Sequence, residues 1–227
     1  MMFGGTEISS CPQCGKWIKR QTYGSMNTFG ATIWSDNYIV GSMYINSLEV
    51  AICAHCEKCI LTKDLISEAY IPSVLEMYDE DMMGNKVHKT DPSILEDKYQ
   101  DAKALFLPGF NSLKEALNYI GEGEIVVRHN IWQHLNHRFR KKKIKNLSKE
   151  NEQFYINNVK KLIDLIKIEN DNDQIRLAEL YRNIGDFESS REHLQRVEKE
   201  ELKKLRPKFE NEIEKGNRNT FILHDNR

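Results

Sequence analysis

The sequence contains no long apolar run, and it has no cysteine after residue 59. No stretch approaches the roughly 18–20 apolar residues that a membrane-spanning helix needs. The first residues hold neither the basic nor the apolar segment of a secretory signal. Both absences predict a cytoplasmic protein that does not enter a membrane. The five cysteines all lie within the first 59 residues, and an odd number in a reducing compartment favours metal binding over disulfides.

The sequence also lacks the motifs of common catalytic sites. It holds no glycine-rich phosphate loop, no Gly-x-Ser-x-Gly nucleophile turn and no His-Glu-x-x-His motif. The formal net charge is -1, which is not the charge of a polybasic nucleic-acid-coating chain. Residues 1–110 carry a net charge of -5 and residues 111–227 one of +4. We therefore predict a protein that is not an enzyme and that has at least two modules.

The cysteines form two Cys-x-x-Cys pairs and one neighbour. Cys11 and Cys14 are followed by Gly15, and Cys53 and Cys56 form the second pair. Two thiolates at this spacing bind one metal ion from a tight turn, and a glycine after the second ligand lets backbone amides face the sulfurs. Two such pairs complete a tetrahedral site without an open position, which favours a structural role. The sequence therefore predicts one structural Zn²⁺ bound by Cys11, Cys14, Cys53 and Cys56.

Cys59 leaves an alternative open, because it forms an overlapping Cys-x-x-Cys pair with Cys56. We favour Cys53 as the ligand, since the alternating residues 48–52 predict a strand that leads into it. Cys59 is then an unliganded thiol packed beneath the turn, and His55 is a spacer. A rubredoxin-type iron site would use the same ligands, whereas a thioredoxin-like redox pair needs a βαβ pattern that surrounds neither pair.

The segment between the two pairs predicts a β-hairpin. Residues 29–34 are apolar and rich in β-forming types, 35–37 are a turn signal, and 38–40 are apolar again. A hairpin is the kind of insertion that a ribbon tolerates between its two metal-binding turns. We therefore assign residues 1–61 to one small, β-rich zinc-ribbon module.

The rest of the chain predicts a linker followed by a helical domain. Residues 62–110 are predicted as a linker or irregular excursion with a short helix at 64–70. Residues 111–216 show helical periodicity, and the capping-box spacing of Ser112 and Glu115 starts the first helix. The further helices are predicted at 124–143, from Ser148, from Asp171 or Asn172 to Gly185, from Asp186 to about 205, and at 207–215. Residues 217–227 are predicted to form a flexible tail.

Residues 174–205 resemble one tetratricopeptide repeat (TPR), a helical hairpin found in protein-binding arrays. Leu177 and Ala178 match the leucine and small residue of the repeat, Tyr181 its first-helix aromatic, and Ser190 the small residue where two helices cross closely. Only one repeat is legible, and a stable array needs about three, so neighbouring helices would have to complete the domain. The alternative is a plain helical hairpin within an all-α domain.

A basic stretch without acidic residues covers 125–149. Its net charge of +8 and its interleaved aromatic residues suggest nucleic-acid binding as an alternative function, because cations neutralise phosphates and exposed aromatics stack on bases. The candidate contacts are Arg138, Arg140, Lys141, Lys142, Lys143 and Lys145. The competing interpretation is a solvated helix end with a core-facing aromatic stripe. His134 and His137 share a helix face, but without a nearby carboxylate we interpret them as surface histidines.

The chain as a whole is similar to bacterial proteins of unassigned function that join an N-terminal zinc ribbon to TPR-like helices. The resemblance rests on both cysteine pairs, on residues 28–36, on the helix at 132–140 and on residues 174–197. Such proteins often have glycine after the Trp-Ser-Asp turn and after the second Cys-x-x-Cys, where this chain has Asn37 and Glu57. We expect an α+β protein, with a zinc ribbon followed by a helical bundle. It would be a zinc-binding adaptor for another protein, with nucleic-acid binding as the alternative.

Overall fold

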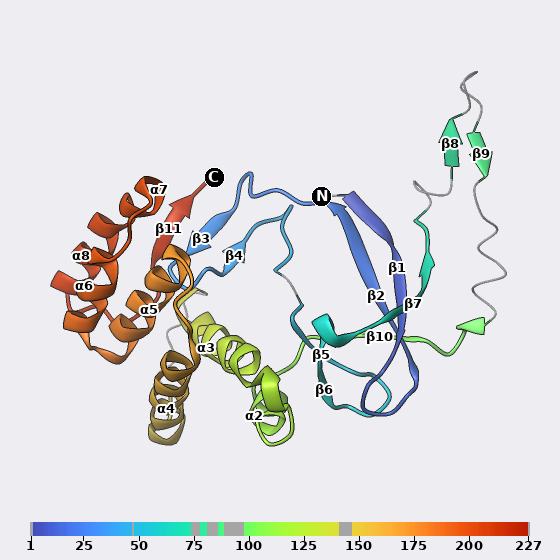
Figure 1. The fold of residues 1–227 in the computed structure, drawn as a ribbon, viewed down its shortest axis with the longest axis horizontal. Coiled ribbons are helices and arrows are strands. Elements are labelled where there is room, and N and C mark those ends of the chain that lie inside the picture. The colour runs from blue at the N-terminus through green and yellow to red at the C-terminus, as the bar shows by residue number, and fades with distance from the viewer. Residues whose placement is uncertain are drawn as a thin grey trace. The chain divides into compact units, whose positions relative to one another are not determined.

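The computed structural model describes residues 2–46, 48–73, 78–80, 86–88, 98–140 and 147–226. The chain forms two compact units that are interleaved in sequence. The cysteine unit comprises Met1–Thr28 and Met43–Ile120, and the helical unit comprises Phe29–Ser42 and Gly121–Arg227. The first is rich in strands and the second in helices (Figure 1), which confirms the α+β class. None of the described helices has the length and apolar character needed to cross a membrane.

Two antiparallel hairpins carry the cysteine turns of the cysteine unit. β1 (Met2–Ser10) pairs with β2 (Trp17–Ser25), and β5 (Val50–Ile52) pairs with β6 (Cys59–Leu61). The first hairpin is the centre of a sheet in the order β10-β2-β1-β7. Its outer strands are β7 (Ser67–Ile71), antiparallel to β1, and β10 (Lys103–Ala104), parallel to β2. Each Cys-x-x-Cys turn therefore connects two paired strands.

The prediction of a helix at 64–70 is wrong for most of its residues. A 3₁₀ turn, η1 (Thr62–Asp64), is followed by strand β7, which pairs with β1. A short stretch of mixed polar and apolar residues fits either a helix or a strand, and pairing with the edge of β1 decides in favour of a strand. β8 (Tyr78–Glu80) and β9 (Lys86–His88) form an antiparallel pair, while much of the predicted excursion lies outside the described residues.

Helix α2 (Phe110–Ala116) belongs to the cysteine unit, although the sequence predicted that the helical domain starts at residue 111. Its N-cap is Gly109, so Ser112 and Glu115 do not form the predicted capping box. Leu113 and Ala116 are buried, and the helix packs beside β6. Packing of this apolar face, rather than the capping spacing, fixes where the helix begins.

The helical unit contains a series of short helices with well-defined ends. Its helices are α3 (Glu124–Arg140) after the 3₁₀ turn η2 (Gly121–Gly123), α4 (Lys149–Leu165), α5 (Asp171–Ile184), α6 (Phe187–Gln195), α7 (Glu200–Lys203) and α8 (Arg206–Glu214). Ser148 and Asp186 cap α4 and α6 as predicted, because their side chains accept the amides of Asn151 at 3.2 Å and Ser189 at 3.1 Å. Gly185, with φ of 87°, ends α5.

Two helix boundaries differ from the prediction. The N-cap of α5 is Asn170, which forms a capping box with Asp173, instead of Asp171 or Asn172. α6 ends at Gln195 instead of continuing to about residue 205. Asp171 accepts the amides of Glu198 at 2.9 Å and Lys199 at 2.7 Å, and these bonds hold the chain in a turn between α6 and α7.

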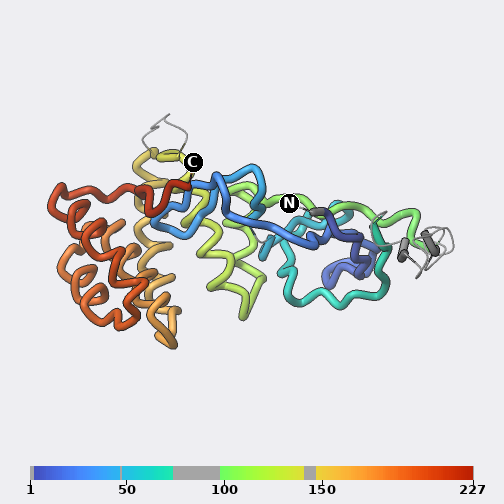
Figure 2. Tube along the Cα trace, turned by 90° about the horizontal axis from the view of Figure 1, so that it is seen from above, coloured from blue at the N-terminus to red at the C-terminus, as the bar shows by residue number. Residues whose placement is uncertain are grey.

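The predicted ribbon hairpin forms, but in the helical unit. β3 (Thr32–Trp34) and β4 (Ile39–Val40) are antiparallel, and β11 (Ile222–Asp225) pairs with the other edge of β3. Figures 1 and 2 show this C-terminal strand beside the hairpin. The division at residue 61 therefore differs from the observed one, and the described part of 217–227 is not a flexible tail. Its Leu223 belongs to the hydrophobic core.

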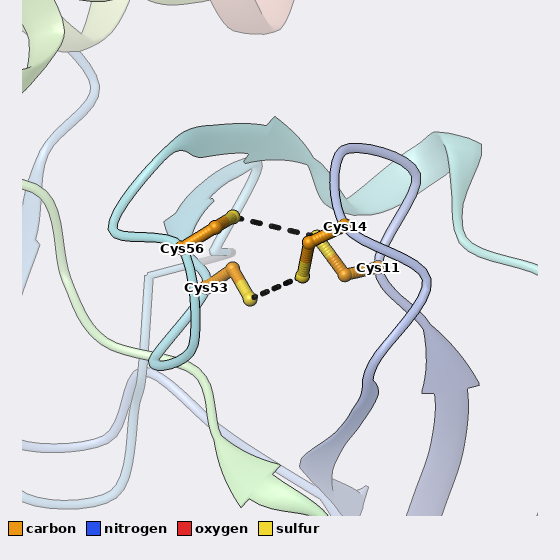
Figure 3. Close-up of side chains that lie close together, drawn as sticks. All are labelled: Cys11, Cys14, Cys53 and Cys56. Atoms are coloured by element: carbon orange, nitrogen blue, oxygen red, sulfur yellow. Dashed lines mark hydrogen bonds between the residues drawn. The ribbon is translucent and has the colours of Figure 1, made fainter.

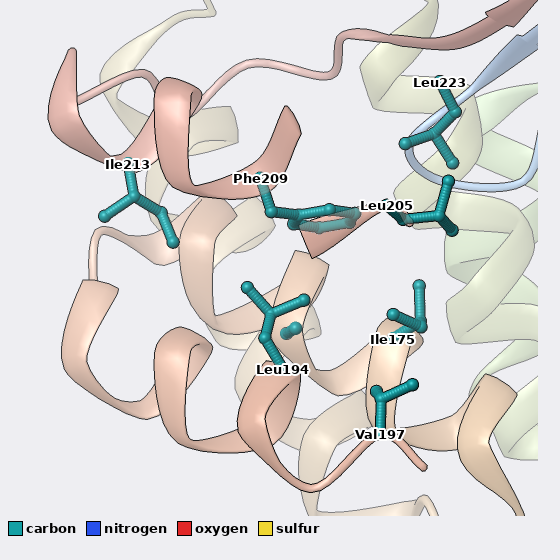
Figure 4. Close-up of a cluster of buried hydrophobic side chains, with 8 residues drawn as sticks. Ile175, Leu194, Val197, Leu205, Phe209, Ile213 and Leu223 are labelled. Carbon is teal, nitrogen blue, oxygen red and sulfur yellow. The ribbon is translucent and has the colours of Figure 1, made fainter. Parts of the chain in front are cut away.

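That core fills the space between α5, α6 and α8 (Figure 4). Its buried members are Ile175, Ala178, Leu194, Val197, Leu205, Phe209, Ile213 and Leu223. Ile175 to Leu205 come from the stretch predicted as a helical hairpin, whereas Phe209, Ile213 and Leu223 come from the chain that follows it. The hairpin is therefore buried by its C-terminal neighbours, as an isolated repeat requires.

Candidate metal centre

The two cysteine turns, Cys11–Lys16 and Cys53–Lys58, repeat the same hydrogen-bonding pattern. The amide of the fifth residue donates to the carbonyl of the first, at 2.8 Å in one turn and 2.9 Å in the other. The amide of the first residue donates to the carbonyl of the sixth, at 2.9 and 3.0 Å. The amide of the third residue, Gln13 or His55, points at the sulfur of the first at 3.4 Å. Both turns thus aim backbone dipoles at a sulfur that would carry negative charge in a metal site.

The fifth residue of each turn adopts a left-handed backbone conformation. Gly15 has φ of 70° and Glu57 has φ of 59°. Glycine reaches this region without steric cost, whereas the Cβ atom of any other residue comes too close to the backbone carbonyl oxygen there. Glu57 therefore keeps the geometry of the second turn in spite of its residue type, because the hydrogen bonds of the turn and the paired strands on both sides impose it.

The four predicted ligands come together. Their sulfur atoms all lie within 4.8 Å of one another, and they point toward a common centre from the two turns (Figure 3). The sulfurs of Cys11 and Cys56 are 3.9 Å apart, as are those of Cys14 and Cys53. A tetrahedral metal with metal–sulfur bonds of about 2.3 Å needs sulfur–sulfur separations of about 3.8 Å. The donor set therefore fits one tetrahedral metal ion.

The surroundings of the sulfurs affect their protonation in different ways. Burial raises the pKa of Cys11 to about 12, and burial also raises the pKa of Cys56. Burial acts on Cys53 in the same direction, but amide hydrogen bonds from His55 and Cys56 outweigh it and lower its pKa. A metal ion has to displace the thiol protons that remain, so metal binding and deprotonation are coupled.

Cys59 and His55 do not join the sulfur cluster. The thiol of Cys59 donates to the Ser112 carbonyl at 3.4 Å, and its amide donates to the Tyr119 hydroxyl at 2.9 Å. The His55 ring bonds the Trp17 carbonyl through Nε2 at 2.9 Å. Cys59 thus forms a buried contact between β6 and the α2 region. Cys53, and not the alternative Cys59, is the fourth member of the sulfur cluster.

Two of the predicted nucleic-acid contacts point into the helical unit. Arg140 is 3% exposed and forms an ion pair with Asp36, and its guanidinium lies 4.4 Å from the Tyr38 ring centre. Arg138 is 15% exposed and lies over the rings of Phe139 and Tyr155. Burial lowers the pKa of Arg140 to about 9, which leaves it charged at neutral pH and in need of the Asp36 carboxylate.

The remaining predicted contacts, Lys141, Lys142, Lys143 and Lys145, lie outside the described residues, so their role stays a prediction. His137 packs edge-on against His134, with ring centres 6.1 Å apart. Its Nδ1 accepts a hydrogen bond from Arg140 at 2.9 Å, and its ring packs edge-on against Tyr38 at 4.6 Å. Within the part of the chain that the structure describes, the four cysteines are the single group of three or more close metal-ligating side chains.

The helical unit contains a buried polar cluster that the sequence did not predict. Glu179 forms an ion pair with Arg182 at 2.6 Å, and both side chains have no exposed area. Asn183 accepts from the Trp132 indole at 2.7 Å and donates to Glu179 at 3.1 Å. Tyr155 donates to Asn183 at 3.2 Å. The helical periodicity could have indicated this cluster, because Glu179 and Arg182 lie on the same apolar face of α5 as Ile175.

Comparison with known protein-family models, with curated proteins and with solved structures finds no match to this chain.

Proposed function

We propose that this protein is a zinc-dependent adaptor, in which one structural Zn²⁺ holds the cysteine unit together and the helical unit binds another protein. The observation that carries the proposal is the sulfur cluster, whose four donors satisfy a tetrahedral ion completely. Such a site has no position for water or substrate, so its role is to stabilise the fold.

Zinc is the metal that we assign, because four thiolates in tetrahedral geometry suit this soft, redox-inert ion. The paired turns of two hairpins, each supplying two sulfurs, support a zinc-ribbon arrangement. A structural zinc of this kind contributes roughly 10–16 kcal/mol of binding free energy at neutral pH. The cysteine unit has a small core, so it depends on that contribution.

The α5–α6 hairpin supports a TPR-like protein-binding role. Ala178 and Ser190 take the small positions at the crossing and have no exposed area. The Ser190 hydroxyl donates to the Ala178 carbonyl at 2.7 Å, so the two helices approach closely at that point. α4 precedes the hairpin and α8 follows it, which leaves exposed charged residues along α6 for a partner. We therefore place the partner-binding surface on the hairpin.

Metal analysis of the purified protein tests the zinc assignment. We expect one zinc per chain in the natural sequence and loss of that zinc in Cys14→Ser. The matched control is Cys59→Ala, which removes a neighbouring thiol that lies outside the cluster and should keep the zinc. Retention of the zinc in Cys14→Ser, or its loss in Cys59→Ala, would contradict the ligand assignment. Iron in place of zinc would contradict the choice of metal.

Affinity purification with charge-reversed variants tests the adaptor role. Glu188 and Glu192 are exposed on α6. A partner is first identified as a protein that binds the natural chain when both are purified, and we expect Glu188→Lys/Glu192→Lys to abolish that binding. Lys160 is exposed on α4, and Lys160→Glu should retain that protein. If both variants bind the partner equally well, the partner does not bind at α6. If no protein binds saturably, the adaptor role is contradicted.

A further inference from the structure

We infer that residues 29–42 couple the two units, so that metal binding by the cysteine unit stabilises the helical unit. The inference rests on the metal binding proposed above and goes beyond it. The cysteine unit supplies both ends of this insert, because the chain leaves it after Thr28 and returns to it at Met43. The amide of Asn27 donates to the carbonyl of Met43 at 3.1 Å, which holds the two ends together at the base of the insert.

The insert satisfies buried charges of the helical unit. The Asp36 carboxylate, with no exposed area, pairs with Arg140 of α3 and accepts from Asn136 at 3.0 Å. The Asp36 backbone carbonyl accepts from Gln133 at 2.9 Å. Without the insert, the Arg140 guanidinium would be a buried charge without its counter-charge, which is a strongly unfavourable state. The helical unit therefore requires the insert to be docked.

A second contact fixes the insert to α5 and to the C-terminal strand. The Ser35 hydroxyl donates to Glu179 at 2.7 Å and accepts the amide of Phe221 at 3.0 Å. β3 pairs on one side with β4 and on the other with β11. Arg182 donates to the carbonyls of Asn217 and Asn219 and so clamps the same C-terminal segment. The insert is thus the central strand element of the helical unit, although it lies far from the other residues of that unit in sequence.

The cysteine unit determines how easily the insert can dock. About 80 residues separate the insert from η2, and they all belong to the cysteine unit. When that unit is folded, its boundary residues Met43 and Ile120 are held at a fixed separation, so the loop is already closed. When it is unfolded, docking must close a flexible loop of this length, and the free-energy cost of closure rises with the logarithm of the loop length, as about (3/2)RT ln n.

The fold of the cysteine unit depends in turn on the metal. One of its hydrophobic clusters consists of Cys11, Ile18, Ala51, Cys53 and Ile60, so two predicted ligands are themselves part of the core. β2 leaves the first cysteine turn toward the insert, and β5 leads from the insert into the second. A metal that joins the two turns therefore fixes the strands on both sides of the insert.

Thermal unfolding of the full chain tests the coupling directly. Trp34 and Trp132 lie in the helical unit, whereas Trp17 lies in the cysteine unit, so Trp17→Phe makes tryptophan fluorescence report on the helical unit alone. We expect metal removal by a chelator to lower the fluorescence midpoint by about 5 °C, equivalent to a coupling of about tenfold. Metal content is measured on the same samples.

The outcomes separate the two proposals. One metal per chain with an unchanged midpoint overturns the coupling and leaves the metal site intact. No bound metal overturns both. As a matched variant, flexible ten-residue Gly-Ser insertions after Thr28 and after Ser42 keep every contact within each unit but release the ends of the insert. We expect these insertions to reduce the metal-dependent shift by at least half, and an undiminished shift would overturn the role of residues 29–42.

Reciprocity supplies a second readout. If the metal stabilises the folded helical unit, then the folded helical unit must tighten metal binding by the same factor. Asp36→Ala lies outside the cysteine unit and removes the counter-charge of Arg140. The two proteins are compared at a temperature at which the helical unit is unfolded in Asp36→Ala but folded in the natural chain. In a competition titration, we expect Asp36→Ala to bind the metal about tenfold more weakly than the natural chain does. Equal affinity overturns the coupling.

Discussion

The left-handed conformation of Glu57 makes this residue a point of strain in the second cysteine turn. Its φ of 59° lies in the same left-handed region as that of Gly15, whose φ of 70° carries no steric cost in the first turn. We expect Glu57→Gly to raise the free energy of unfolding of the metal-bound protein by about 0.5–1 kcal/mol, since relief of about 1–2 kcal/mol of strain exceeds the added chain entropy of glycine. Chemical denaturation followed by circular dichroism measures the change.

Asn37 provides a matched comparison for that prediction. It has φ of 60°, but asparagine tolerates the left-handed region better than glutamate does. Asn37→Gly should therefore give a smaller gain than Glu57→Gly, close to zero. A larger gain at Asn37 than at Glu57 would contradict the strain argument.

The buried ion pair between Asp36 and Arg140 leads to a second prediction at single residues. We expect Asp36→Ala to destabilise the helical unit by about 3–5 kcal/mol, because it leaves the Arg140 charge buried without a counter-charge. The double variant Asp36→Ala/Arg140→Met should be less destabilised than Asp36→Ala alone, since it removes the orphaned charge. A double-mutant cycle in urea measures the coupling, and additive losses would show that the pair contributes little.

At this residue scale, the sequence predicts the metal site well because the ligand spacing is local. Cys-x-x-Cys closes within one turn, and the strand at 48–52 is sufficient to prefer Cys53 over Cys59. The Asp36–Arg140 pair is different, because its partners lie about 100 residues apart and each residue taken alone suits a solvated position. Only the folded arrangement shows that Arg140, predicted as a phosphate contact, is buried.

The crossing of α5 and α6 is the point at which a single side chain controls the packing of two elements. Ser190 has no exposed area, and its hydroxyl donates to the Ala178 carbonyl at 2.7 Å. Ser190→Ala removes this bond but keeps the size, and we expect a loss of about 1 kcal/mol. Ser190→Leu forces the helices apart and should cost about 1–3 kcal/mol more.

Thermal denaturation of both variants separates size from hydrogen bonding. A small loss in Ser190→Ala with a large loss in Ser190→Leu is the expected order, because close approach is what the small residue permits. The exposed ion pair of Glu192 and Arg196, at 3.4 Å on the same helix, serves as the control, and Glu192→Ala should change stability by less than about 1 kcal/mol. Equal losses in the two Ser190 variants would contradict a close crossing.

At the element scale, local signals locate helix starts better than they assign elements to units. Ser148 and Asp186 cap their helices because an N-cap bond depends on residues three positions away. The end of α6 and the pairing of β7 depend on Asp171 and on the edge of β1, which lie far away along the chain. The hairpin at 29–40 is recognisable from its apolar, β-forming runs on both sides of a turn signal, but nothing local shows that its pairing partner is β11.

At the scale of the whole molecule, we expect the proposed metal site to make the protein sensitive to acid. The free thiols hold protons that the metal must displace, and burial keeps the pKa of Cys11 near about 12. Protonation thus favours the metal-free form, so metal affinity should fall as the pH falls. If two or more protons are released on binding, the affinity should drop at least about a hundredfold per pH unit near neutral pH. Competition titrations with a chelator of known pH dependence, between pH 8 and about pH 6, measure the slope.

A matched variant distinguishes ligand protons from other titrations. Cys59 has a raised pKa through burial, yet it lies outside the sulfur cluster, so Cys59→Ala should show the same slope as the natural chain. A shallower slope in Cys59→Ala would place that thiol among the ligands. If residues 29–42 couple the two units, loss of the metal at low pH should also lower the thermal unfolding midpoint of the helical unit, measured by tryptophan fluorescence in Trp17→Phe. A metal-loaded sample that loses its metal at low pH without that shift would show that the two units respond to acid independently.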